Sequence, residues 1–160
     1  MENEEKLEKI YIDLPEHWAT GGESLWALPL GNNLYELRNI PFRAYGLNFG
    51  DVVRTVSESQ DLKPEVIEIK KSNGHKTLRV HFNESVEIEK RKEYLSQLHA
   101  FRAFYENAND KLFAIDIEPD GDYESICSKL NEWENQGILE YETCEFRVPG
   151  RFDLDSSEDK

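Results

Sequence analysis

The chain has few cysteines, no long apolar run and few positive charges. Its two cysteines, Cys127 and Cys144, are too few and too far apart for a disulfide framework or a zinc site. No stretch approaches the roughly 20 apolar residues of a membrane-spanning helix, and Met1–Lys6 lack the basic and apolar regions of a signal peptide. We therefore expect a soluble cytoplasmic protein without a metal or a cofactor.

Positive charge is scarce relative to negative charge. Lys and Arg number 19 against 33 Asp and Glu, which gives a formal net charge of −14. Such a field repels phosphate backbones and anionic lipids, so we expect no nucleic acid and no membrane as partners. The same field would attract a basic protein and speed its encounter, although solubility alone also explains acidity.

Motifs of the familiar enzyme classes are missing. There is no Gly-rich phosphate loop and no Gly-x-Ser-x-Gly elbow. The four histidines, His17, His75, His81 and His99, are scattered, and none stands at metal-ligand spacing from another or from a cysteine. A Cys-His nucleophile pair would have to be assembled from distant segments, so we assign no catalytic residues.

The apolar content is sufficient for a globular domain. Hydrophobic residues make up 38% and aromatic residues 11% of the chain, enough to offset the entropy of ordering. From Ser24 to Val56, short apolar runs alternate with turn residues such as Gly31-Asn32-Asn33. We predict a flexible acidic N-terminus over 1–8 and a β-rich part over 9–62.

A β-hairpin is predicted over residues 66–82. Two strand-like runs, Val66–Lys71 and Thr77–Phe82, flank Asn73-Gly74, a dipeptide that readily adopts the positive φ angles of a hairpin turn. The spacing then predicts an amphipathic helix from Val86 to about Asn107, whose apolar positions recur in steps of three and four.

The remaining segments alternate between strand and helix. Leu112–Ile117 is short and apolar, which indicates a buried strand. A helix is expected over 122–136, with Asp120 or Asp122 as its N-cap and Gly137 as its left-handed C-terminal residue. A last strand is predicted over 138–146.

The predicted fold class is α+β. A small β-rich N-terminal part precedes a hairpin-helix-strand-helix-strand second half, which the order suggests is ferredoxin-like. We place this second part at 63–149 around one core, followed by an acidic tail over 150–160.

An acidic run follows the buried strand. Its oxygen-bearing side chains at alternate positions imitate the start of a calcium loop, but Cys127 stands where that loop needs a bidentate Glu. We therefore predict an exposed, metal-free negative patch that contacts a partner and consists of Asp116, Glu118, Asp120, Asp122 and Glu124.

Aromatic residues are concentrated in the N-terminal half. Together with two polar groups they could line a ligand pocket, made of Trp26, Phe42, Arg43, Tyr45 and Asp51. The alternative is that the aromatic rings form the core of a small β-subdomain.

Three N-terminal motifs carry a family resemblance. Glu23-Ser24-Leu25-Trp26-Ala27, Asn39-Ile40-Pro41-Phe42 with Tyr45-Gly46-Leu47, and Gly50-Asp51-Val52-Val53 resemble, in order and spacing, a bacterial family known as domain of unknown function 4265. Leu112–Ile117 and Gly137–Tyr141 are similar to its C-terminal half. The resemblance implies no activity, cofactor or catalytic residue.

The expected function is protein binding. Small acidic cytosolic families often include antidotes, so we expect a non-enzymatic, immunity-type protein that blocks a basic toxin or nuclease. The alternative is a small-molecule-binding protein or an enzyme that uses the aromatic N-terminal half. The sequence leaves the oligomeric state open.

Overall fold

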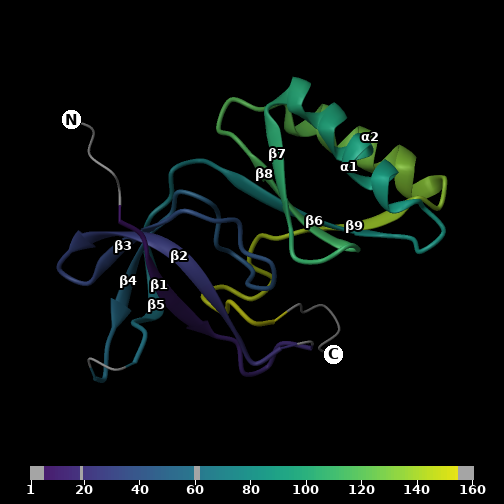
Figure 1. Ribbon diagram of the computed structural model, residues 1–160. Coiled ribbons are helices and arrows are strands. Elements are labelled where there is room, and N and C mark those ends of the chain that lie inside the picture. Colours follow the sequence, from purple (N-terminus) through teal and green to yellow (C-terminus); the bar gives the residue numbers. More distant parts are fainter. Residues whose placement is uncertain (1–5, 19, 60–61, 155–160) are drawn as a thin grey trace. The chain divides into compact units, whose positions relative to one another are not determined.

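The computed structural model describes residues 6–18, 20–59 and 62–154, which fall into two compact units. Unit 1 comprises the residues up to Asn73 and those from Glu145 onward, and unit 2 is Gly74–Cys144 (Figure 1). The chain divides after residue 73 instead of after residue 62, because strand β5 (Glu65–Lys71) pairs with strands of unit 1. The mixed α+β class is confirmed.

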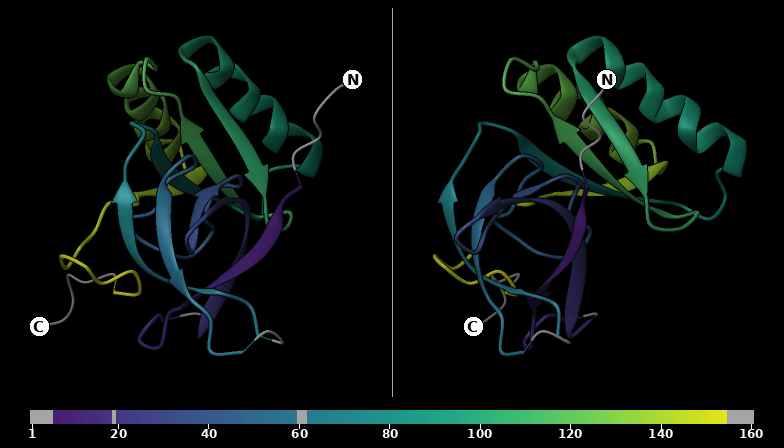
Figure 2. Two further views of the ribbon diagram at one scale, coloured as in Figure 1. Left: turned by 90° about the vertical axis from the view of Figure 1, so that its left-hand side faces the viewer. Right: turned by 60° about the vertical axis from the view of Figure 1, so that its left-hand side comes forward.

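Unit 1 contains a closed five-stranded barrel (Figure 2). Its strands are β1 (Glu8–Asp13), β2 (Gly22–Gly31), β3 (Leu34–Leu37), β4 (Val52–Val56) and β5. Consecutive strands are antiparallel, and β5 closes the barrel beside β1 through a parallel pairing of Glu65 with Tyr11. The left-handed Asn32 and Asn33 turn β2 into β3. The predicted β-rich character of this part is confirmed, but only the β2–β3 turn is tight, because residues 38–51 separate β3 from β4.

The C-terminal segment packs on unit 1 and is part of its structure. The Asp153 side chain is buried, and its Oδ2 accepts the backbone N–H of Glu16 at 2.8 Å. The carbonyl of Phe152 accepts the N–H of Tyr45 at 2.8 Å. Residues 150–154 of the predicted acidic tail therefore belong to unit 1, whereas residues 1–5 and 155–160 lie outside the described residues.

Unit 2 is a four-stranded antiparallel sheet with two helices on one face (Figure 1). Strands β6 (Lys76–Phe82), β7 (Ala103–Asn107), β8 (Leu112–Ile117) and β9 (Leu139–Thr143) take the order β7-β8-β6-β9. Helices α1 (Ile88–Ser96) and α2 (Tyr123–Asn135) bury their apolar faces against it. The core includes Phe82, Phe113, Ile126, Leu130 and Trp133.

The predicted hairpin over 66–82 is wrong, although both of its strands exist. Strand β5 pairs with β1 and β4, whereas β6 pairs with β8 and β9. Closing the barrel needs both edges of β5, and the almost fully buried β6 is a central strand that needs two neighbours of its own. Residues 72–75 therefore join two sheets, and Gly74 has a φ of 91° within this connection.

The predicted helix over 86–107 is too long. α1 ends at Ser96 and passes into a 3-10 turn, η1 (Gln97–Phe101), which Arg102 ends in the left-handed conformation with a φ of 66°. Residues 103–107 then form β7, where Tyr105 pairs with Ile115 and reaches the core from a strand. The helical spacing of Leu95 and Leu98 is real, because both are buried.

The β8–α2–β9 segment follows the prediction closely. Every residue of β8 is buried, and Asp122 caps α2 through its Oδ1, which accepts the N–H of Ser125 at 3.1 Å. At the other end, Ile138 N–H donates to the carbonyl of Trp133 at 3.0 Å around the left-handed Gly137. This turn leads directly into β9.

Candidate functional site

The acidic run 116–124 is partly engaged by contacts within its own unit. Glu118 forms an ion pair with Arg102 at 2.5 Å, and Asp120 forms another with the same guanidinium at 2.8 Å. Asp122 is occupied as the helix cap. Among the described residues of the run, Glu124 is exposed and makes no such contact. One guanidinium offsets one negative charge, so the run keeps most of its negative charge.

Asp116 differs from the other four because it is buried in β8. Its Oδ1 lies 2.8 Å from Nδ1 of His75, and the two side chains are 11% and 17% exposed. Burial raises the pKa of Asp116, while the hydrogen bond and charge of His75 act in the opposite direction. The sequence prediction of an exposed Asp116 is wrong, because the side chain lies on a central strand.

The proposed aromatic pocket does not form one open wall. Trp26 is 46% exposed on β2, and the ammonium of Lys9 lies 5.0 Å from its ring. Tyr45 and Asp51 are buried, while Phe42 and Arg43 are half-buried in the loop between β3 and β4. Buried side chains cannot line an open pocket. Tyr45 and Asp51 therefore fit the alternative, in which these residues belong to the core of the N-terminal β-rich part.

An open hollow in unit 2 is the stronger candidate site. It has a volume of about 780 Å³ and lies where the end of β6, the end of α2 and the start of β9 meet. Its polar lining consists of His81, Asn83, Glu84, Glu134, Glu140 and Tyr141. Three carboxylates and no Lys or Arg are among its lining residues, so the hollow favours a cationic group.

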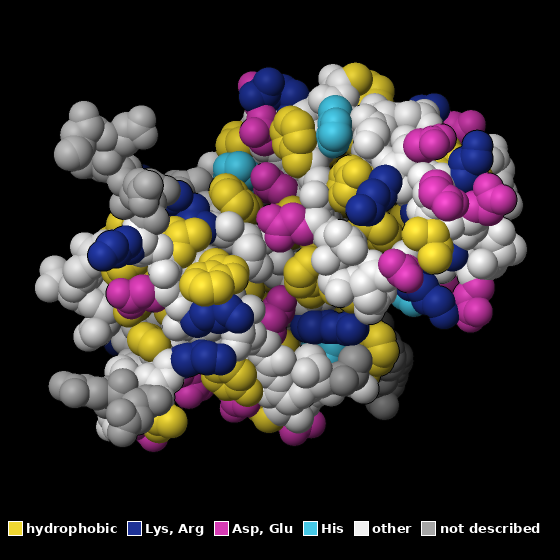
Figure 3. Space-filling model, in the orientation of Figure 1, with side chains coloured by type: hydrophobic (Ala, Val, Ile, Leu, Met, Phe, Trp, Pro, Cys, Tyr) yellow, Lys and Arg dark blue, Asp and Glu magenta, His cyan; other side chains and the backbone are white. Residues whose placement is uncertain are grey.

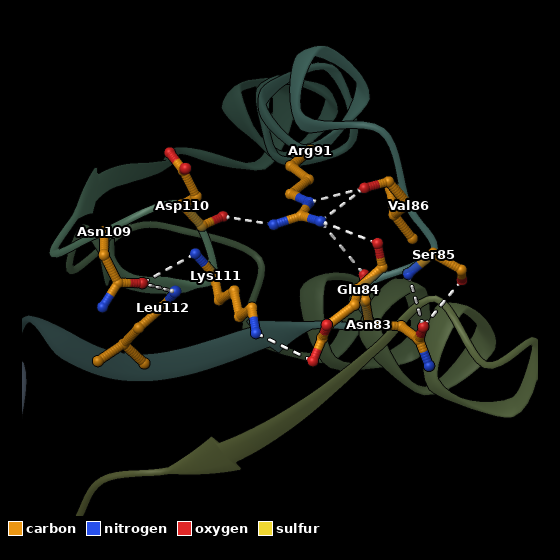
Figure 4. A network of polar contacts seen from close by, with 9 residues as sticks. All are labelled: Asn83, Glu84, Ser85, Val86, Arg91, Asn109, Asp110, Lys111 and Leu112. Atoms are coloured by element: carbon orange, nitrogen blue, oxygen red, sulfur yellow. Dashed lines mark hydrogen bonds and ion pairs between the residues drawn. The ribbon is translucent and has the colours of Figure 1, made fainter.

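The rim of this hollow is held in place by Arg91 of α1 (Figure 4). The guanidinium is buried and donates to the carbonyl of Val86 at 2.6 Å and to that of Asp110 at 2.9 Å. Weaker bonds reach the carbonyls of Asn83 and Glu84. One side chain thus ties the 83–86 loop to the 108–111 loop, which fixes the lining residues Asn83 and Glu84.

The carboxylates of the hollow differ in how far they are engaged. Glu84 is 80% exposed and lies 3.1 Å from the ammonium of Lys111. Oε2 of Glu134 accepts the backbone N–H of Tyr141 at 3.3 Å, whereas Glu140 is exposed on β9. Burial, with smaller contributions from Cys127 and Glu134, raises the pKa of the Tyr141 phenol. The site can therefore receive a positive charge but offers no evident nucleophile.

Negative charge is unevenly distributed between the two units. Residues 74–144 carry eight Lys and Arg against fifteen Asp and Glu, whereas the described part of unit 1 carries ten against eleven. In Figure 3, Asp and Glu side chains gather at the right-hand end of the view. The acidity of the chain is thus concentrated in the unit that contains the hollow and in the terminal segments.

The described residues contain neither a metal-ligand group nor a membrane-spanning helix. Within 6–18, 20–59 and 62–154, no three His, Cys, Asp or Glu side chains are grouped to hold a metal ion. In the same ranges, no helix is long and apolar enough to cross a bilayer.

Comparison with known proteins gives a family and a fold. The model of a family described as a domain of unknown function, DUF4265, matches residues 23–141. The chain belongs to the DUF4265 family. No curated protein is detectably similar to it in sequence. A solved structure, the "Novel crystal structure of a hypothetical protein from Neisseria gonorrhoeae", is similar with a TM-score of 0.75 at 15% identity, covering 89% of this chain and 97% of that one. At this identity the likeness establishes the fold alone.

In this DUF4265 protein, polar residues of the N-terminal motifs contact the backbone. The carboxylate of Glu23 accepts the N–H groups of Phe42, Arg43 and Ala44, and Oδ1 of Asn39 accepts the N–H of Trp26. The first two motifs therefore hold each other in place. These residues build the fold, and the carboxylates of the hollow come from three separate segments that no sequence motif connects.

Proposed function

We propose that this DUF4265 protein is a non-enzymatic cytosolic protein that binds a basic protein partner. Its most specific form is an immunity-type antidote that blocks a basic toxin or nuclease. The observation that carries the proposal is the carboxylate-lined hollow in the unit that holds most of the ordered negative charge. A cationic side chain that entered it would meet Glu134 and Glu140 and would compete with Lys111 for Glu84.

The negative charge of the chain would speed the approach of a basic partner as well as stabilise its contact with the hollow. An acidic surface raises the association rate of a basic partner, and salt reduces this effect because the Debye length is only about 8 Å at physiological ionic strength. Charges at the rim act mainly on encounter, whereas buried anchors set the dissociation rate. The carboxylates of the hollow and those of the run 116–124 would therefore both contribute to steering.

Growth and binding kinetics test the proposal. If a gene beside the one for this chain encodes a basic protein, its expression alone should arrest growth, and co-expression with this chain should restore it. The purified pair should associate more slowly as salt rises. A neighbouring product that is harmless and does not bind, together with turnover of a small metabolite by this chain, would contradict the proposal.

Unit 2 also supports the ferredoxin-like arrangement that its sequence suggests. Its elements run β-α-β-β-α-β when η1 is counted with α1, and every neighbouring pair of strands is antiparallel. We infer this arrangement for residues 74–144 alone.

A further inference from the structure

Strand β9 is an edge strand beside the acidic hollow. In the part of the chain that the structure describes, it pairs with β6 on one side and with no strand on the other. Such an edge presents main-chain N–H and C=O groups to a partner, and natural proteins usually protect it with charges or a covering side chain.

The ladder determines which residues face outward. Asn83 N–H donates to the carbonyl of Ile138 at 2.9 Å, so residue 138 and, by alternation, Glu140 and Glu142 direct their backbone groups toward β6. Leu139 and Tyr141 therefore direct theirs to the open side. The contact between Glu134 and Tyr141 N–H agrees with this assignment.

Glu134 occupies the place of a missing strand. Its Oε2 accepts the Tyr141 N–H at 3.3 Å, which is where the carbonyl of an added strand would accept the same proton. This bond is long, so its net contribution is small and it can be exchanged. A displaced Glu134 carboxylate would then be available for a cationic side chain of the added strand.

The charges around the edge select the added strand. Glu140 lies on β9 itself, and Glu84 and Glu134 line the adjoining hollow. Side chains directly opposite each other across neighbouring strands interact most strongly, and opposite charges stabilise such pairs. A second copy of β9 would place Glu beside Glu, whereas Lys or Arg would be complementary.

We propose that the β9 edge binds an extended, Lys- or Arg-bearing segment of a partner protein by strand addition. Main-chain bonds to Leu139 and Tyr141 would provide affinity, and a cation in the hollow would provide specificity. This inference rests on the proposed function and specifies how the basic partner is held.

A short peptide in which lysine alternates with valine is a direct probe. Titrated into the full-length chain, it should shift the amide signals of Leu139 and Tyr141 and protect them from hydrogen exchange. The same peptide, N-methylated at alternate residues, keeps its charge but loses N–H donors, and should bind about tenfold more weakly. Equal binding of the two peptides, or unchanged Leu139 and Tyr141 amides, would overturn strand addition.

A charge-matched pair of variants tests the acidic contribution. Glu84→Lys with Glu140→Lys should weaken peptide binding by about tenfold or more. The control, Glu89→Lys with Glu93→Lys on exposed positions of α1, makes the same change in net charge away from the edge. Equal weakening by both pairs would show that only net charge matters and would contradict the proposal.

These outcomes separate this inference from the proposed function. A natural basic partner that binds equally well to the Glu84→Lys, Glu140→Lys variant disproves the β9 edge while the proposed function stands. If the chain binds the lysine peptide at β9 but binds no basic protein, strand addition at β9 is supported and the proposed function is contradicted. A dimer in light scattering whose Leu139 and Tyr141 amides are protected from exchange without any peptide would instead assign the edge to a second copy and overturn the proposal.

Discussion

Arg91 is the residue whose burial is hardest to anticipate. It lies on α1 with 4% of its surface exposed, and its N–H groups donate to main-chain carbonyls of two loops. A guanidinium has five donors in a fixed fork, which a lysine ammonium cannot reproduce. The helical pattern alone places Arg91 among the charged positions, and nothing in the sequence shows the carbonyls it meets.

Replacing Arg91 should therefore lower stability strongly. Arg91→Met leaves buried carbonyls without donors and should reduce the free energy of unfolding by about 3 kcal/mol, and Arg91→Lys by about 1–2 kcal/mol. Urea denaturation measures both. Lys92→Met, at an exposed neighbouring position, should change stability by no more than about 0.5 kcal/mol. A result for Arg91→Met close to that of Lys92→Met would show that the loops do not need the guanidinium.

At the scale of elements, local sequence signals predicted which segments form helices and strands, but not which strands pair with each other. Asp122 and Gly137 set the ends of α2 as predicted, because capping depends on neighbouring backbone groups. The Asn73-Gly74 turn did not make a hairpin, because the partners of β5 and β6 lie far away in the sequence. The hollow was missed for the same reason, since Glu84, Glu134 and Glu140 come together only in three dimensions.

The α2 cap gives a pH-dependent prediction. Hydrogen bonds from Ser125 hold the pKa of Asp122 below its ordinary value of 3.8, so the cap contributes stability above that pH and loses it as the pH falls through the folded-state pKa. Asp122→Asn retains capping without a titrating group, and Asp122→Ala removes both. Thermal melts from pH 7 to pH 2 should show the wild type losing stability relative to Asp122→Asn only at the acidic end. Parallel curves for the two proteins would contradict the lowered pKa.

At the scale of the whole molecule, unit 2 is built from one continuous stretch of the chain and unit 1 from two. The core of unit 2 comes from one continuous stretch, residues 74–144. Unit 1 takes its strands from residues 8–71 and further contacts from residues 145–154. The sequence could indicate two parts, but the return of the chain to unit 1 depends on contacts such as that of Asp153 with Glu16, which no local pattern reveals.

A fragment of residues 74–144 should fold by itself. Chains of about 55–65 residues often do so when they own a complete core, and the clustered apolar side chains of this unit all lie within the fragment. Dispersed amide signals and a cooperative melt would confirm this. The comparison fragment, residues 6–73, lacks Phe152 and Asp153 and should be less ordered. A molten 74–144 fragment would show that the unit needs the remainder of the chain.

The discontinuity of unit 1 also affects the order of events during synthesis. Because a domain can finish folding only after its residues have left the ribosome, all residues of unit 2 become available before residues 145–154 do. The N–H groups of Glu16 and Tyr45 must wait for Asp153 and Phe152, the last acceptors to emerge. We therefore expect unit 1, whose translation begins first, to finish folding last. A released chain that is truncated after Cys144 should hold a finished unit 2 and an incomplete barrel.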